Sequence, residues 1–168
     1  MTQATSPFRR REGRIDLTAL AVLLLVSAAV AGLGATVTVQ NVDTWYATLA
    51  KPSFNPPNWL FGPVWTVLYI VMAIAAWRVW LARRQWPVAL PLGLYAAQMV
   101  LNFTWSPLFF GLHRVGAALV DILSLAGLLA ATTALFWRRD RLAGALMVPY
   151  LVWVLFAAPL NFAIWRLN

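Results

Sequence analysis

The sequence of 168 residues contains no cysteine, one histidine and only five acidic residues. Without cysteine, the chain has no disulfide, no thiolate metal site and no cysteine nucleophile. One histidine, His113, and so few carboxylates cannot supply a serine–histidine–aspartate set or a metal cluster, and no glycine-rich phosphate loop occurs. Conventional acid–base or metal-dependent catalysis is therefore not predicted, and we expect no obligatory cofactor.

Charge is also scarce, since 11% of the residues are charged and 62% are hydrophobic. Soluble domains are about 45–50% apolar and about 25% charged. This composition excludes an ordinary soluble domain, and it excludes a disordered chain, because disordered chains are poor in apolar residues. The net charge is +8, but the basic residues flank apolar segments and do not form one patch. We therefore predict contact with a lipid bilayer and no nucleic-acid partner.

The apolar segments predict an all-α protein, an integral membrane bundle of five transmembrane helices, because a spanning helix needs roughly 20 residues. The predicted spans are residues 17–37, 59–81, 88–111, 116–137 and 142–165. A basic tail over residues 1–16 precedes a single transmembrane domain over residues 17–168. A Pro-rich loop over residues 38–58 separates the first two spans, and Pro56 follows Asn55 as expected for the start of a helix.

The basic residues predict how the bundle is oriented. Of the 13 basic residues, only Lys51, Arg114 and Arg166 fall on the side opposite the N-terminus. In a bacterial inner membrane this asymmetry places the N-terminus in the cytoplasm. Gly93 and Ala97 form a pair of small residues on the third span, which predicts close contact in a homodimer.

Ten tryptophans are present, and most of them fall near predicted span ends, where an aromatic belt accounts for them. Trp65, Trp105 and Trp153 lie deeper. At 1.5 Å per residue, these three and also Asn102 and Ala157 lie roughly 9–18 Å below the outer surface. The pattern is typical of an aromatic small-molecule cavity with one amide. A densely packed core without a cavity would have the same pattern.

Asp121 is the only carboxylate inside a predicted span. A charge in the bilayer is costly and usually faces the interior of the bundle. Two interpretations remain open: Asp121 is a structural hydrogen-bond partner for a neighbouring helix, or it handles a ligand or a proton.

Several motifs follow one another in a specific order along the chain. The first loop and second span contain Trp45-Tyr46, Leu49-Ala-Lys-Pro52, Pro56-Pro57-Asn-Trp59 and Trp65-x-x-Leu-Tyr69. The later spans contain Gln98-x-x-x-Asn102-x-x-Trp105-x-x-x-Phe109-Phe110 and Pro149-Tyr-Leu-x-Trp153-x-x-Phe-Ala157, followed by Leu160-Asn161. Together the motifs resemble the TspO/MBR family of tryptophan-rich sensory proteins, which includes the translocator protein or peripheral benzodiazepine receptor.

The resemblance implies a five-helix bundle, often a homodimer, that binds porphyrins such as protoporphyrin IX. It implies a receptor or sensor with a regulatory or stress-related role. The implied ligand-binding residues are Tyr46, Trp65, Asn102, Trp105, Trp153 and Ala157, with Asp121, Asn161 and Pro56 in support. The Asn102 amide or the Trp65 indole N–H would donate hydrogen bonds to the macrocycle.

Two further functions fit the same resemblance. One is the transport or export of porphyrins or related hydrophobic ligands, and the other is light-assisted porphyrin degradation in which Trp65 or Trp153 takes part. Mitochondrial relatives carry a cholesterol-recognition pattern with a tyrosine at the end of the fifth helix. Phe162 stands at that place here, so we predict only weak sterol binding.

Overall fold

The structure is a computed structural model that describes the backbone of residues 7–168 and the side chains of residues 17–168. This part of the chain is helical and contains no strand. In chain order, the elements are α1 (Pro7–Val42), α2 (Trp45–Thr48), α3 (Asn58–Leu81), the 3-10 turn η1 (Ala82–Arg84), α4 (Ala89–Ser106), the π-helical turn η2 (Pro107–Gly111), α5 (Val115–Arg139) and α6 (Arg141–Leu167). An all-α fold is therefore confirmed for the described residues.

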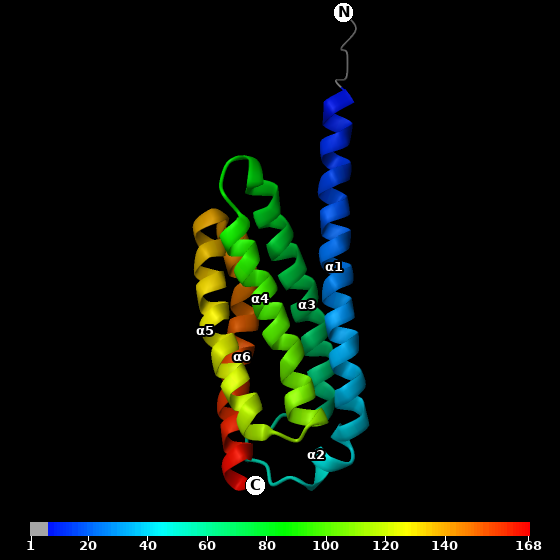
Figure 1. Cartoon of the computed structure of the whole chain (residues 1–168), viewed down its shortest axis with the longest axis vertical. Helices are drawn as coiled ribbons and strands as arrows, with labels where there is room; N and C mark the ends of the chain where they lie inside the picture. Colours follow the sequence, from blue (N-terminus) through cyan, green and yellow to red (C-terminus); the bar gives the residue numbers. More distant parts are fainter. Residues whose placement is uncertain (1–6) are drawn as a thin grey trace, which may run out of the picture.

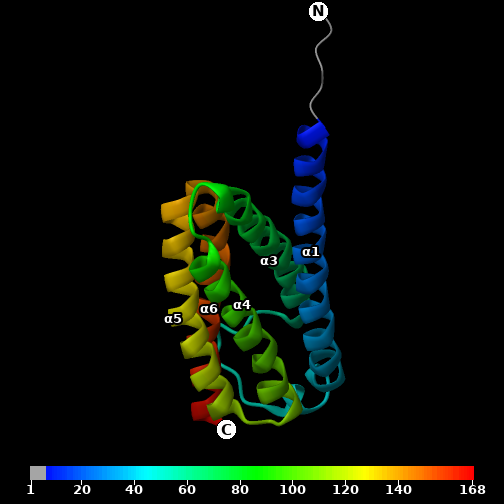
Figure 2. The same cartoon turned by 45° about the horizontal axis from the view of Figure 1, so that its top comes forward.

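The long helices run side by side in an elongated bundle (Figure 1). Helix α5 packs against α4 and α6, and α3 packs against α1 and α6. Helix α1 stands at the edge of the bundle, and its first turns project beyond the ends of the other helices (Figure 2). The loop after α2 passes under the end of the bundle at which the chain terminates (Figure 1). We call this end the C-terminal end.

Within the described residues, four helical segments are long and apolar enough to cross a membrane, one fewer than predicted. They are residues 17–42, 58–84, 115–139 and 141–167. Helix α4 has 18 residues and is long enough, but it is not among them because polar residues, including Gln98 and Asn102, lower its hydropathy. Both side chains are buried, at 0% and 6% exposure. The polar groups that lower the hydropathy of α4 therefore face the other helices.

The first helix is longer than the predicted span at both ends. Its backbone is helical from Pro7, so residues 7–16 of the predicted basic tail form the start of α1. Residues 1–6 of that tail lie outside the described residues. Proline is favourable in the first turn, and no further proline interrupts the helix before Val42. The predicted loop over residues 38–58 consequently begins later and contains the short helix α2.

At the end opposite the C-terminal end, α5 and α6 join in a tight turn. The Asp140 carboxylate accepts hydrogen bonds from two backbone N–H groups in the first turn of α6 and forms an ion pair with Arg78 at 2.7 Å. Gly144 packs directly against Trp137, and a Cβ added to Gly144 would lie 2.6 Å from the Trp137 Cα atom. The turn therefore depends on a capping carboxylate and on the missing side chain of one glycine.

Candidate functional site

A cavity of about 490 Å³ lies between the helices in the half of the bundle nearer the C-terminal end. Its wall is mostly apolar and is built from α1, α2, α3, α4, η2, α5 and α6. The aromatic residues in the wall are Tyr46, Trp59, Phe61, Trp65, Tyr69, Trp105, Phe109 and Phe110. A volume of roughly 300–1,000 Å³ is typical of small-molecule sites. The molecule therefore has an internal space suited to a hydrophobic ligand.

Five of the six residues predicted to bind a ligand lie in the wall of this cavity: Tyr46, Trp65, Asn102, Trp105 and Ala157. They come from α2, α3, α4 and α6, so the fold brings together residues that are far apart in the sequence. Asn161, predicted as a supporting residue, is also in the wall.

Trp153 is the sixth predicted residue, and it does not line the cavity. Its ring packs edge-on against Phe61 of α3, with centroids 5.8 Å apart, and also contacts Phe156. Counting residues gives the depth of a side chain along a helix but not its rotation about the helix axis. The face of α6 on which Trp153 lies could therefore not be predicted in this way. Trp153 therefore lies behind the wall, where it supports an aromatic residue that does line the cavity.

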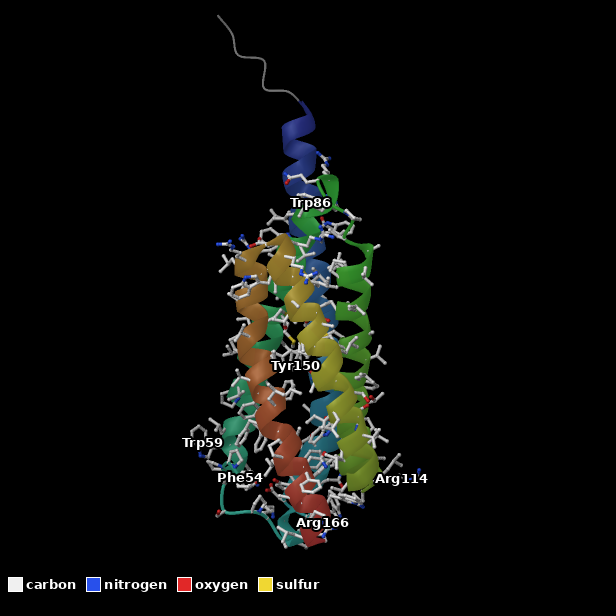
Figure 3. The ribbon with its side chains drawn as sticks, turned by 90° about the vertical axis from the view of Figure 1, so that its left-hand side faces the viewer. Phe54, Trp59, Trp86, Arg114, Tyr150 and Arg166 are labelled. Atoms are coloured by element: carbon white, nitrogen blue, oxygen red, sulfur yellow. The ribbon has the colours of Figure 1, made fainter. Side chains whose placement is uncertain are left out.

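The floor of the cavity contains a hydrogen-bonded cluster centred on Asn102. The Asn102 Oδ1 atom accepts a hydrogen bond from the Tyr69 hydroxyl, and Nδ2 donates one to the Tyr150 hydroxyl at 2.8 Å. All three residues are buried, and Tyr150 lies near the middle of the bundle (Figure 3). This cluster ties α3, α4 and α6 together.

The available hydrogen-bond donors differ between the two residues predicted to orient a ligand. One N–H of Asn102 is already used by Tyr150. The Trp65 indole N–H, in contrast, has no hydrogen bond to any other described residue. Trp65 is therefore the better-placed free donor in the wall.

Trp105 of α4 is held in place by a hydrogen bond to α6 and by a stacked ring. Its indole N–H donates to the Asn161 Oδ1 atom at 3.0 Å, and Asn161 Nδ2 donates to the Val115 carbonyl at 3.0 Å. The Trp105 ring stacks on Phe109 with centroids 4.9 Å apart and planes at 20°. Asn161 thus fixes the Trp105 ring and leaves an aromatic face toward the cavity.

The π-helical turn η2 shapes the aromatic wall after α4. Pro107 lacks a backbone N–H and cannot donate the normal helical hydrogen bond. In the turn that follows, the Leu112 N–H donates to the Pro107 carbonyl, which is five residues back and not the usual four, at 2.8 Å. In this wider turn two consecutive side chains, Phe109 and Phe110, are both buried and both line the cavity. Such π turns occur frequently at functional sites.

Tyr46 of α2 closes the cavity at the C-terminal end, where it is 4% exposed. Its hydroxyl donates to the Asn55 Oδ1 atom at 2.7 Å, and the Lys51 ammonium lies 4.6 Å from the ring centroid. Burial raises the pKa of the Tyr46 hydroxyl above its ordinary value. The ring is thereby held over the cavity by contacts within the first loop.

The first loop is also attached to distant parts of the chain. The Asn168 side chain exchanges two hydrogen bonds, of 3.0 and 3.1 Å, with the backbone of Ala50. Trp45 stacks on His113, with ring centroids 4.1 Å apart, and His113 has a positive φ of 56°. These contacts attach the first loop, which covers the cavity, to the C-terminus and to the turn before α5.

Asp121 and Pro56, the other predicted supporting residues, lie outside the cavity wall. The Asp121 Oδ1 atom accepts a hydrogen bond from the Thr104 hydroxyl at 2.7 Å, which links α5 to α4. This contact favours the interpretation of Asp121 as a structural partner. The Pro56 carbonyl accepts a hydrogen bond from Asn55 within the loop. Among the described residues, no group of three His, Asp or Glu side chains could hold a metal ion.

The prediction did not include two kinds of wall residue. Tyr69 is four positions after Trp65, so both lie on the same face of α3, and this spacing was a usable signal. The first helix contributes Ala31, Gly34 and Ala35 to the wall. Small residues in a membrane helix are compatible with close helix packing as well as with a cavity, so the sequence offered no means of choosing.

Comparison with known proteins supports the interpretation of the fold. A sequence profile of the TspO/MBR family matches residues 21–166 of this chain. Protein CrtK of Rhodobacter capsulatus is 43% identical over 155 residues, which are 92% of this chain and 95% of that protein. The translocator protein of Homo sapiens is 45% identical over 126 residues, which are 74% of this chain and 75% of that protein.

A further relative comes from an archaeon. The tryptophan-rich protein TspO of Archaeoglobus fulgidus is 41% identical over 154 residues, covering 92% of this chain and 99% of that protein. The match to the family profile includes every residue of the cavity wall and most of the four apolar helices. The chain therefore belongs to the TspO/MBR family and is a multi-pass integral membrane protein.

Proposed function

We propose that this protein is a membrane receptor or sensor that binds a tetrapyrrole, similar to protoporphyrin IX, or another flat hydrophobic ligand. The observation that carries the proposal is the cavity of about 490 Å³, whose wall is aromatic and includes the free indole N–H of Trp65. Aromatic rings supply a large contact area to a planar ligand and prefer stacked or edge-on arrangements. The names of the relatives, translocator and tryptophan-rich proteins, are compatible with this role.

The wall divides the interactions with such a ligand into two kinds. Trp105, held by Asn161, offers a ring face for stacking, and Trp65 offers an indole N–H to a polar edge. Tyr46 covers the ligand from the first loop. Because water is largely excluded by these rings, one hydrogen bond in this setting orients the ligand more strongly than it would in solvent.

The proposal includes five membrane crossings, with α4 and η2 together forming the third. The buried amides of α4 support this, since they lower its hydropathy without facing lipid. We further propose a cytoplasmic N-terminus and a homodimer. Gly93 and Ala97 are exposed on α4, and a Cβ added to Gly93 meets no atom within 4 Å. This leaves room for a partner helix at the predicted contact.

A fluorescence titration with protoporphyrin IX tests the proposal on purified protein in detergent. Ala157→Phe fills the cavity wall without removing a hydrogen bond, so we expect tryptophan quenching to require at least about ten-fold more porphyrin. Leu155→Phe is the matched control, because Leu155 is on the same helix, 54% exposed and outside the wall. Equal quenching of Ala157→Phe and the wild type would place the ligand elsewhere.

Transport of the same ligands is the second candidate function. Several wall residues of α1 and α3 are exposed, among them Ala35, Val39, Gly62 and Thr66. Exposure on this side supports exchange of a hydrophobic ligand with the bilayer. Net porphyrin flux across proteoliposomes would favour a transporter, whereas binding without flux favours a receptor. Faster bleaching of bound porphyrin in light than in detergent alone would instead favour degradation.

A further inference from the structure

A second cleft, of about 670 Å³, lies at the C-terminal end of the bundle. It shares no lining residue with the cavity described above. Its residues come from the first loop, the start of α5 and the end of α6: Trp45, Leu49, His113, Arg114, Val115, Gly116, Trp165, Arg166 and Asn168. Arg114 and Arg166 both lie at this end of the molecule (Figure 3).

The two arginines that line this cleft are without partners in the described part of the chain. Neither guanidinium forms an ion pair or a hydrogen bond there. At the opposite end, two arginines do have side-chain partners, since Arg78 pairs with Asp140 and Arg139 lies over the ring of Trp86. The cleft therefore has two positive charges that no side chain neutralises.

The remaining polar groups in the cleft are also suited to an anion. A Cβ added to Gly116 would lie 2.9 Å from the Trp165 indole nitrogen, so this indole lies directly against the first turn of α5. The indole N–H has no hydrogen bond to another described residue. No acidic side chain lines the cleft.

The position of the cleft indicates where its anion comes from. Trp45 and Trp165 line it at the end of the membrane-spanning segments, where tryptophan side chains lie at the level of lipid headgroups. Phe162 and Leu167 are exposed nearby on α6, where acyl chains would pass. We infer that this cleft binds the phosphate of an anionic phospholipid headgroup, with Arg114 and Arg166 as the charged contacts. The site does not depend on the proposed porphyrin function.

Native mass spectrometry of the full chain in detergent, with equimolar phosphatidylglycerol and phosphatidylcholine, tests this inference. We expect the wild type to retain phosphatidylglycerol preferentially. An arginine that contacts the bound headgroup contributes a preference of about five-fold for an anionic lipid. Arg114→Gln and Arg166→Gln should each reduce the preference about five-fold, and the double variant about 25-fold. Arg138→Gln, an exposed arginine at the opposite end, is the control and should leave the preference unchanged.

Three results would overturn the inference. Equal retention of the two lipids by the wild type would mean that no anionic headgroup is selected. An equal loss in Arg138→Gln would mean that total charge, and not the cleft, sets the preference. Displacement of phosphatidylglycerol by millimolar inorganic phosphate would assign the cleft to a free ion. Thermal unfolding without lipid shows whether each variant folds, and if the double variant does not, the two single variants decide.

Discussion

Substitutions at two buried amides on α4 are expected to have different effects on the stability of the bundle. Asn102 and Gln98 are one turn apart on the same helix and are 6% and 0% exposed. Asn102 bonds to Tyr69 and Tyr150, whereas neither amide atom of Gln98 has a hydrogen-bond partner among the described residues. We predict that Asn102→Leu destabilises the protein and that Gln98→Met does not.

The magnitude follows from the number of hydrogen bonds that each substitution removes. Interhelical hydrogen bonds in membrane proteins contribute on average about 0.6 kcal/mol and at most about 1.7 kcal/mol each. Asn102→Leu removes two, so the free energy of unfolding should fall by about 1–3 kcal/mol. Gln98→Met removes an unpaired buried amide of similar length, and such a group costs about 1–3 kcal/mol to bury. The stability of this variant should be unchanged or higher.

Thermal unfolding in one detergent, followed by circular dichroism, measures both effects. A loss of 1 kcal/mol lowers Tm by about 2–4 °C for a chain of this size, so Asn102→Leu should lower Tm by about 2–12 °C. A cycle with Tyr150→Phe should show coupling, because that hydroxyl accepts from Asn102. If Gln98→Met lowers Tm as much as Asn102→Leu, or if the cycle is additive, these hydrogen bonds do not stabilise the bundle as argued.

Three further substitutions test other contacts. Asp140→Ala should lower the free energy of unfolding, measured by chemical denaturation, by about 1–2 kcal/mol because it removes a helix cap and an ion pair. Asp140→Asn keeps an acceptor for the cap and should lower the free energy of unfolding by less. Gly144→Ala should lower Tm in thermal scans by several degrees, since the new Cβ would overlap Trp137; an unchanged Tm would contradict the tight turn. Because burial raises the pKa of Tyr46 above 10.0, the contribution of Tyr46 to stability should be constant below about pH 9 and fall at higher pH, as this hydroxyl ionises first in the unfolded chain. Tyr46→Phe should reduce this alkaline decline in denaturation measured from pH 9 to 11.

Most of the helices could be predicted from the sequence because their signal is local. Helices of sufficient length and hydropathy are found in four of the five predicted spans. Helix α4 deviates because polar residues lower its hydropathy, and only the tertiary structure shows that the amides of Gln98 and Asn102 are buried against neighbouring helices. The start of α1 at Pro7 was likewise not predicted, since a basic composition favours a surface tail without forbidding a helix.

The candidate site was partly predictable for a related reason. Counting residues from the predicted span ends placed Trp65, Asn102 and Trp105 at similar depths, and all three line the cavity. Trp153 satisfied the same criterion and lies behind the wall, packed on Phe61. Residue counting measures distance along a helix, whereas lining a cavity also depends on how each helix is rotated against its neighbours.

The sequence by itself determined that the chain is helical, that it lies in a membrane and that its basic residues are segregated toward one end, because hydropathy and charge are properties of single segments. Only the tertiary structure decided which side chains share a space. Contacts between separate helices form the Asn102 cluster, the aromatic wall after Pro107 and the cleft that both Arg114 and Arg166 line. Such contacts arise from packing, which fixes helix rotation and register by the fit of side chains from several segments at once.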